Sequence, residues 1–434
     1  MAFRTFDQPD VSRRALLRGG VLFGGMAALG GVPFARAALA QGPTWPSVRA
    51  AVNSYVAEGK VANMVALLGW GQREAEVIAS GVLTFGRTQA AGPNTLYRIY
   101  SMTKPITGMA AMMLIDEGKL GLDQPIADLI PAYADVRVQK TYDGGVGPAD
   151  LEPLVRPITV RHLLTHTAGL GYGIVQKGPI KTLYEERGLI PGQVSRIPIP
   201  GLGRGTPVRG LDTFADALAT VPLVAQPGTR WAYSVSLDLL GRVIEVASGQ
   251  EFAAFLNERI FAPCGMTSTW FRVPESEVGR LTTNYGILNG VPLPIDPAVT
   301  SIYLDQPAFP FGGAGLVSSP RDYDRFLQML VGYGTIEGRR VMSEAAVRLG
   351  TSNLLPEGVR TEGTFAGGAG FGAGGRVQGS AFGWGGAAGT AAFADPERGL
   401  RGSLFTQYMP SEAYPIQRTF SELVLKDLAA QRGN

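Results

Sequence analysis

Residues 97–105 of this 434-residue chain read YRIYSMTKP, and this stretch decides how the rest is interpreted. Proline lacks an N–H group and is tolerated only near the first turn of a helix, so Pro105 predicts a helix that begins at about Ser101 or Met102. Ser101 then stands at the helix N-terminus, where the helix dipole favours developing negative charge. Lys104, three residues later, lies on the same face, close enough for a neutral amine to take the serine proton. The same S-x-x-K spacing also fits a capping serine followed by a solvated lysine, so the rest of the chain has to decide.

The composition limits the classes of protein that this motif can belong to. The chain is 45% hydrophobic and 17% charged, which excludes a disordered chain or a coiled coil. Its length suits roughly two to three domain-sized units, or one large fold that carries an inserted domain. The single cysteine, Cys264, excludes an internal disulfide framework and a cysteine-based zinc site, and we expect it to be a small buried residue at a helix end.

Net charge is confined to the first forty residues. They contain five arginines and two aspartates, and removing them from the 39 basic and 36 acidic residues of the whole chain leaves equal numbers of each sign. A body without net charge gives no electrostatic reason to expect a nucleic acid or an anionic membrane as a partner.

Residues 1–40 are interpreted as an export signal of the twin-arginine type. The sequence SRRALLR at residues 12–18 resembles the twin-arginine consensus, and the glycine-rich apolar stretch at 19–34 is shorter than the ~20 residues of an ordinary membrane span. Ala38-Leu39-Ala40 offers small residues for cleavage before Gln41. We expect a periplasmic or secreted protein with no stable membrane insertion after cleavage; the alternative is an N-terminal membrane-anchor or amphipathic helix.

The chain after the leader begins with a mixture of helix and strand patterns. A helix is predicted over residues 45–58, and two β-rich runs at 61–69 and 76–86 indicate an antiparallel hairpin. A long helical pattern covers about 101–117. These elements predict the first part of a sheet domain, at residues 41–121.

Residues 122–353 contain mainly short helices broken by Gly/Pro loops, which predicts an inserted, mainly helical domain with its loops. Residues 354–434 return to the sheet domain, with strand-like runs near 370–377, 388–394 and 402–408 and a final helix over about 411–430. We expect strands from both ends of the chain to share one antiparallel sheet, flanked by the first and last helices. The predicted fold class is therefore α/β with an inserted helical domain.

Further stretches that follow residues 97–105 in order point to one family. They are LIDEGKLGL at 114–122, ITVRHLLTHTAGL at 158–170, PGTRWAYSVSLDLLGRVIEVASG at 227–249, FAPCGM at 261–266, the segment 312–326, and FGWGGAAGT at 382–390. Together these motifs resemble the serine β-lactamase-related family, and most of all its class C-like hydrolases and family VIII-type esterases. The resemblance covers nearly all of the chain after the leader, and it implies a β-lactamase-like fold with the active site between the sheet and the helical domain.

The resemblance implies a role for each matching residue. Ser101 matches the acylated nucleophile, Lys104 the adjacent general base, and Tyr233 the tyrosine that shares proton transfer with that lysine. Trp384-Gly385-Gly386 matches a third motif, on the strand that edges the cleft. Ala387 matches the position whose backbone N–H joins that of Ser101 in an oxyanion hole. An acyl-transfer site needs a nucleophile, a base, an acid for the leaving group and two preorganised donors.

Two positions depart from the pattern of β-lactamases and penicillin-binding proteins. Val235 stands where these proteins usually have the Asn of Tyr-x-Asn, so the amide that contacts a substrate's acylamino group is missing. Trp384-Gly385-Gly386 stands where they usually have Lys-Thr-Gly, which removes a cation and a hydroxyl suited to a carboxylate. We expect Val235, Trp384, Gly385 and Gly386 to form the substrate-binding side of an esterase site, with Trp384 as an apolar wall. A packing role in the sheet is the alternative for Trp384, and a core position is the alternative for Tyr233.

Other motifs carry less chemistry. His162 and His166 are the only histidines and lie four residues apart, a spacing that suits a metal pair or a triad base, but the glutamate of a zinc-hydrolase motif is absent. No G-x-S-x-G nucleophile elbow occurs in the sequence. GFGAGG at 370–375 fits G-x-G-x-x-G but has no βαβ context. We therefore expect no metal and no cofactor, and structural roles for both histidines.

The sequence as a whole predicts an exported serine hydrolase that acts through an acyl-enzyme, on carboxylic esters with small or apolar acyl groups. The expected partner is thus a small-molecule ester. A β-lactamase or D-amino-acid peptidase is the alternative in the same class. Transfer of the acyl group to an alcohol instead of water also stays open. An alternative of another class is a non-hydrolytic ligand-binding protein of the same fold, although a binder has no need of Ser101, Lys104 and Tyr233 together.

Overall fold

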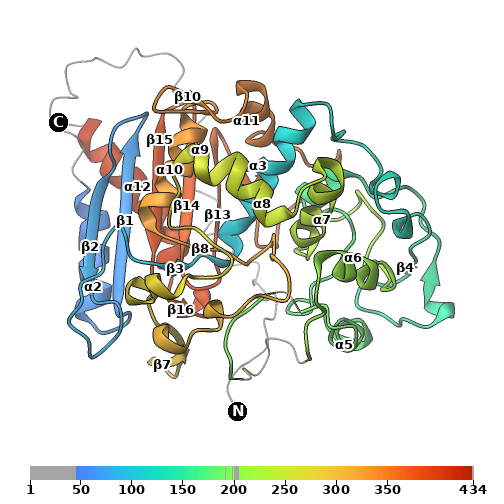
Figure 1. Cartoon of the computed structure of the whole chain (residues 1–434), viewed down its shortest axis with the longest axis horizontal. Coiled ribbons are helices and arrows are strands. Elements are labelled where there is room, and N and C mark those ends of the chain that lie inside the picture. The colour runs from blue at the N-terminus through green and yellow to red at the C-terminus, as the bar shows by residue number, and fades with distance from the viewer. Residues whose placement is uncertain (1–44, 191, 198, 200–204, 433–434) are drawn as a thin grey trace.

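A seven-stranded antiparallel sheet organises the computed structural model, which describes residues 45–190, 192–197, 199 and 205–432 (Figure 1). In spatial order its strands are β11 (Gly370–Phe371), β12 (Arg376–Gln378), β13 (Ala381–Gly385), β14 (Ala391–Asp395), β15 (Leu400–Phe405), β1 (Asn63–Trp70) and β2 (Glu76–Gly81). Strand β1, from the start of the chain, pairs with β15, from its end, over Val65↔Phe405 to Trp70↔Leu400. The prediction that both ends share one sheet is therefore confirmed.

One face of the sheet is covered by α2 (Pro46–Ala57) and α12 (Ile416–Arg432), the predicted first and last helices. Their apolar side chains meet those of β1 and β15 in a compact cluster that includes Val52, Leu404 and Phe420. Burial of one such side chain contributes about 1.5–3 kcal/mol. Strand β1 is buried along nearly its whole length because helices cover both faces of the sheet, which explains its continuous apolar run.

The other face of the sheet carries α10 (Pro320–Val331), which packs on β14 and β15, and α3 (Thr103–Asp116) contacts β13. Every residue of α3 from Thr103 to Leu114 is buried, since the helix also packs against α7 (Ser236–Ser248) and α11 (Glu344–Gly350). The central position of α3 brings its N-terminus between the sheet and the helical region. The domain boundaries at residues 121 and 353 remain predictions; α10, which precedes the second of them, already packs against β14 and β15.

The helices of the helical region are α4 (Val160–Leu164), α5 (Gly178–Glu186), α6 (Leu211–Ala219), α7, α8 (Phe252–Leu256) and the short α9 (Ala262–Cys264). The region extends from the middle of Figure 1, where α8 and α9 lie, to the right, where α5, α6 and α7 lie away from α2 and α12. Cys264 is buried at the end of α9, where Gly265 terminates the helix in the left-handed conformation, as expected for a small residue at a helix end.

Several short strands lie outside the seven-stranded sheet. They are β3 (Tyr97–Arg98), which pairs with β8 (Val317–Ser318); β4 (Val138–Gln139), which pairs with β5 (Leu151–Glu152); β9 (Thr335–Ile336), which pairs with β10 (Arg339–Arg340); and β6 (Asn284–Leu288), flanked by β7 (Val291–Asp296) and β16 (Tyr408–Met409). The pair β3 and β8 matters most for the site because it fixes the chain just before Ser101.

Two strand predictions differ from the structure at glycines. The run predicted at 76–86 ends as a strand at Gly81, which has φ +88°, and a Cβ there would lie 2.2 Å from the Ala62 carbonyl oxygen. The run predicted at 370–377 is not one strand but the hairpin β11–β12, because the chain reverses around Gly374 at φ +75°. The alternation of apolar and polar residues reveals neither the strand end at Gly81 nor the reversal at Gly374.

Among the helices of the described residues, none is long and apolar enough to cross a bilayer. The predicted export signal falls on residues outside the described ones.

Candidate active site

Ser101 lies on a tight turn between β3 and α3. A single turn of 3-10 helix, η3 (Tyr100–Met102), precedes α3, so the α-helix itself begins two residues later than the earliest predicted start. Tyr100 has φ +43°, a left-handed conformation that a residue with a large side chain adopts at a cost of order 1–3 kcal/mol. The strained residue precedes the predicted nucleophile directly, and Ser101 itself is 8% exposed.

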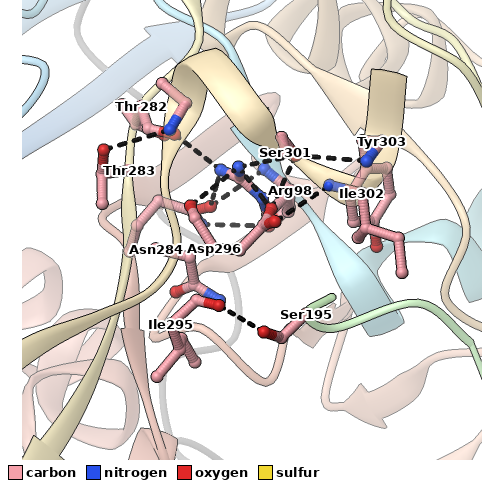
Figure 2. Close-up of polar contacts among 12 residues, drawn as sticks. Arg98, Ser195, Thr282, Thr283, Asn284, Ile295, Asp296, Ser301, Ile302 and Tyr303 are labelled. Carbon is pink, nitrogen blue, oxygen red and sulfur yellow. Dashed lines mark hydrogen bonds and ion pairs between the residues drawn. The ribbon is translucent and has the colours of Figure 1, made fainter. Parts of the chain in front are cut away.

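Arg98 anchors the strand that leads into this turn (Figure 2). Its guanidinium is fully buried and donates to Asp296 Oδ2 at 2.6 Å, to the Thr282 carbonyl oxygen at 2.7 Å and to Ser301 Oγ at 2.9 Å. Figure 2 shows these partners converging on Arg98 from the segment around β6 and β7. A buried charge with several hydrogen bonds is fixed in position, so the end of β3 and the turn after it are held firmly.

The three predicted catalytic side chains meet at one oxygen atom. Lys104 Nζ lies 3.1 Å from Ser101 Oγ, and Tyr233 Oη donates to the same oxygen at 2.7 Å. Lys104 is fully buried, and its Nζ also donates to the Gly313 carbonyl oxygen at 2.7 Å. The structure thus brings together residues that lie 132 positions apart in the sequence. A proton could pass between Ser101 and either neighbour without any rearrangement.

Tyr233 is held by the segment that contains His166. The His166 carbonyl oxygen accepts from the Ala232 N–H at 2.9 Å, and its Nδ1 lies 3.0 Å from Ser234 Oγ, so both neighbours of Tyr233 are fixed. The two rings pack with their centroids 4.8 Å apart. Burial, and then the charge of Lys104, lower the pKa of His166 well below its ordinary value, so the imidazole is neutral.

The two histidines do not form a metal pair. His162 Nδ1 accepts from the Thr159 N–H at 3.1 Å and caps α4, and burial lowers its pKa to about 4. His166 instead packs beside Tyr233. Within the described ranges, no group of three or more His, Cys, Asp or Glu side chains could hold a metal ion.

The third motif approaches the nucleophile turn through its glycines. Strand β13 packs against η3, and a Cβ at Gly386 would lie only 2.3 Å from the Ile99 carbonyl oxygen. Gln417 Nε2 donates to the Gly386 carbonyl oxygen at 2.6 Å and would contact a Cβ at Gly385 at 2.7 Å. These close contacts bring the turn that contains Ala387 beside the nucleophile. In the part of the chain that is described, the Ala387 N–H donates no hydrogen bond, as an oxyanion-hole donor requires.

Trp384 contacts Tyr233 directly and is half-buried. Its indole Nε1 donates to Tyr233 Oη at 3.2 Å, and its ring lies against Phe371 with centroids 5.3 Å apart. Trp384 therefore has a packing role in the structure, and its role as an apolar wall for the substrate stays a prediction. Phe365, which sequence reasoning did not single out, is 42% exposed and lies edge-on to Tyr233 with ring centroids 5.6 Å apart. Nothing in its glycine-rich surroundings signals a site residue.

Val235 does not belong to the exposed part of the site. Its side chain has no exposed surface and packs in the main core, and its N–H donates to the Gly171 carbonyl oxygen at 3.2 Å. Val235 directly precedes α7, and the chain direction set by this cap turns its side chain inward. The expectation that Val235 contacts substrate is therefore corrected. Val235 lacks the side-chain amide of the usual asparagine, and its own side chain presents no surface to a substrate.

Comparison with protein families gives one match that covers most of the chain. The family model described as Beta-lactamase matches residues 48–425. Protein Rv1367c of Mycobacterium tuberculosis is 38% identical over 265 residues, which is 61% of this chain and 61% of that protein. Esterase EstB of Burkholderia gladioli is 32% identical over 250 residues, 55% of this chain and 57% of that protein. The chain thus spans about three-fifths of the length of the curated relatives it matches.

Solved structures agree with the fold over a longer stretch. EstCE1, described as a hydrolase with promiscuous acyltransferase activity, superposes with a TM-score of 0.68 at 27% identity, covering 86% of this chain and 96% of that one. Simvastatin synthase LovD from Aspergillus terreus, unliganded, gives a TM-score of 0.70 at 21% identity over 89% and 98% of the two chains. The second likeness concerns the fold alone.

Proposed function

The chain belongs to the beta-lactamase family, and from this premise we propose that it is a serine hydrolase that cleaves carboxylic esters through an acyl-enzyme on Ser101. The observation that carries the proposal is the pair of contacts at Ser101 Oγ, with Lys104 Nζ at 3.1 Å and Tyr233 Oη at 2.7 Å. A nucleophile between two groups that can take and return its proton is what acyl transfer needs. The similarity to Esterase EstB, at 32% identity, supports this reaction class.

The proposed reaction proceeds in two stages. Ser101 Oγ attacks the ester carbonyl while its proton moves to Lys104, and the leaving alcohol is then protonated through Lys104 and Tyr233. Water attacks the acyl-enzyme in the second stage by the same route in reverse. The N–H groups of Ser101 and Ala387 stabilise the oxyanion in each stage; one lost donor of this kind typically costs about 10²–10³ in rate.

Esters with small or apolar acyl groups fit this site better than β-lactams. Trp384 and Phe365 present aromatic surface beside Tyr233, and neither carries a positive charge that could form an ion pair with a carboxylate. An amide or carboxylate buried without a partner costs about 1–3 kcal/mol. Two such losses lower kcat/KM for β-lactams by roughly 10²–10⁴ relative to a site that keeps both contacts.

The direct test compares p-nitrophenyl acetate, butyrate and longer esters with a chromogenic cephalosporin. We expect turnover of the short esters and a far lower kcat/KM for the cephalosporin. Equal or greater efficiency on the cephalosporin would favour the β-lactamase or peptidase alternative, for which Penicillin-binding protein 4 of Amycolatopsis lactamdurans, 28% identical over 282 residues, is a relative. Binding without turnover of either substrate class would favour a non-hydrolytic ligand-binding protein.

Acyl transfer to an alcohol is a second candidate. Monacolin J acid methylbutanoyltransferase of Aspergillus terreus is 28% identical over 242 residues, so a relative named as a transferase supports it. The same acyl-enzyme serves both reactions, and the acceptor decides the product. Adding butanol to the ester assay separates them: a transferase forms mostly butyl ester at alcohol concentrations at which a hydrolase still forms mostly free acid.

We also propose export by the twin-arginine route, on the basis of Arg13 and Arg14 and of the small residues before Gln41. A host with that pathway should export the native chain and retain a variant with Arg13→Lys and Arg14→Lys in the cytoplasm. N-terminal sequencing of the exported form should begin at Gln41. Export of the double variant at the native level would contradict the proposal.

A further inference from the structure

Asp238 is a buried carboxylate that the proposed mechanism leaves without a role. It lies in the first turn of α7, is 1% exposed, and accepts from the Gly313 N–H through Oδ1 at 2.9 Å. The carbonyl oxygen of the same Gly313 accepts from Lys104 Nζ at 2.7 Å. One backbone residue therefore touches the buried carboxyl group of Asp238 on one side and the buried amine of Lys104 on the other.

Gly313 is fixed closely against both groups. A Cβ there would lie 2.6 Å from Asp238 Oδ2, so only glycine lets the backbone come so near the carboxylate. The flanking residues are pinned to α3: Thr107 Oγ1 donates to the Gly312 carbonyl oxygen at 2.7 Å, and the Leu316 N–H donates to Thr103 Oγ1 at 3.2 Å. The position of Lys104 relative to Gly313 is thereby set.

The charges around Asp238 are few. Burial raises the pKa of Asp238 to about 6, although Lys104 on α3 opposes that shift. Tyr172 also faces Asp238, and burial raises the pKa of Tyr172 well above its ordinary value. Around Lys104 itself lie the rings of Tyr172 and Tyr233 and the neutral His166. Asp238 is therefore the anion that acts on Lys104.

We propose that Asp238 is a positioning residue, which holds Lys104 on Ser101 through Gly313 and, as an anion, stabilises the ammonium that forms when Lys104 takes the Ser101 proton. This inference rests on the proposed function. As Ser101 Oγ bonds to the acyl carbon, its proton passes to Lys104 Nζ; the leaving alkoxide then receives a proton through Tyr233, and the site returns to its starting charge. Asp238 keeps its own charge throughout.

Such a role has a signature that a purely structural role lacks. Burial raises the pKa of Asp238 to about 6, so the native protein loses this anion as the pH falls through about 6, and kcat/KM has an acid limb there that a variant without the carboxylate lacks. The limiting kcat also falls, because the ammonium that forms in the transition state loses its counter-charge. A side chain that only fills space would change the limiting kcat and leave the limb where it is.

The test measures kcat and KM for p-nitrophenyl butyrate from about pH 5 to about pH 9, the range in which general acid–base limbs are read. Asp238→Asn keeps an acceptor for Gly313 and removes the charge. We expect this variant to lose the acid limb near pH 6, with kcat about 10–100-fold lower and KM within about threefold. The matched control is Asp322→Asn, a buried carboxyl on α10 whose pKa is also raised by burial and which accepts from the Ser268 N–H at 2.6 Å. Its limb should coincide with that of the native protein.

A second readout separates this inference from the proposed function. The rate at which a fluorophosphonate labels Ser101 depends on the same proton transfer but needs no ester substrate. Labelling without ester turnover would contradict the proposed function while still testing Asp238. If Asp238→Asn does not fold, as judged by circular dichroism, Asp238→Ser replaces it. A labelling limb that coincides with that of the native protein overturns the inference, whatever the loss of rate.

Discussion

Two buried pairs, each of one basic and one acidic side chain, lie beside the nucleophile turn, and their contacts differ. Arg98 and Lys104 stand three residues before and three residues after Ser101. Arg98 meets its carboxylate, Asp296, directly at 2.6 Å. Lys104 and Asp238 do not touch, since Gly313 lies between them and binds both.

The difference shows how one turn can be both rigid and reactive. Arg98 donates hydrogen bonds to Asp296, Thr282 and Ser301. The charge of its guanidinium is therefore fully partnered, and these bonds fix the backbone. Lys104 keeps a contact to Ser101 Oγ at 3.1 Å because its carboxylate is held one residue away. A basic side chain that binds its carboxylate directly supports the structure. One that is separated from its carboxylate keeps a nitrogen that can exchange a proton with the nucleophile.

The largest effect should come from the residue between the two pairs. Ser101→Ala removes the nucleophile and should lower kcat for p-nitrophenyl butyrate by about 10⁵–10⁶, the scale of nucleophile loss in other serine hydrolases. Intact-mass spectrometry after fluorophosphonate treatment should find one adduct on the native protein and none on the variant. Equal labelling of both proteins would move the nucleophile elsewhere.

The reactive side of the comparison is tested by Lys104→Ala combined with Tyr233→Phe. Each single change should lower kcat by about 10³–10⁴, and the double variant should be hardly slower than the worse single one, because residues that act as a unit give non-additive losses. The measurement is a double-mutant cycle on kcat. Losses that multiply would mean that one of the two residues only positions the other.

The structural side is tested by Arg98→Met, which leaves Asp296 buried without its partner. Breaking a buried pair in this way lowers the free energy of unfolding by about 3–5 kcal/mol. Chemical denaturation should show this loss, while the folded fraction, counted by fluorophosphonate labelling, keeps most of its activity per site. Should Arg98→Met instead retain native stability, the contrast between the two pairs would collapse.

Val235→Asn restores the residue usual in β-lactamases at a position that is fully buried here. We expect a loss of about 1–3 kcal/mol in the free energy of unfolding, because the new amide has to find partners inside an apolar core. Hydrolysis of the cephalosporin should not increase. A tenfold gain in its kcat/KM would mean that the asparagine side chain reaches the substrate after all.

The smallest effect should come from Trp384→Phe, which keeps an aromatic wall and removes the hydrogen bond from Nε1 to Tyr233 Oη. One neutral hydrogen bond contributes about 0.5–1.5 kcal/mol, so kcat should fall by about three- to tenfold. Trp384→Leu serves as the comparison, since it removes the ring as well. If both variants lose the same activity, the ring adds nothing beyond the hydrogen bond.

The fold could be predicted from the sequence where patterns are long. The first helix, the hairpin of β1 and β2 and the last helix follow from periodicity, and the motifs around Ser101 identified the family. The sequence did not reveal the reversal at Gly374 or the separation of β13 from β14 within the glycine-rich end. Glycine permits a turn without requiring one, so composition cannot place it.

The site was predictable to a similar degree. The meeting of Ser101, Lys104 and Tyr233 agrees with what the motifs implied, since each lies within a recognisable stretch. Phe365 and the position of Gly313 depend on tertiary packing and carry no local signal. Val235 was misplaced because a motif position gives the residue type but not the direction of its side chain.

The indole of Trp384 also bears on how substrates reach the site. It is a hydrogen-bond donor without charge, at a place where related sites usually carry a lysine, and Lys104 is fully buried. Trp384 itself therefore adds no long-range attraction for an anionic substrate, and it costs a neutral substrate nothing on encounter. Because only attraction between exposed charges is screened by added salt, the association rate for a neutral ester should stay nearly constant as ionic strength rises.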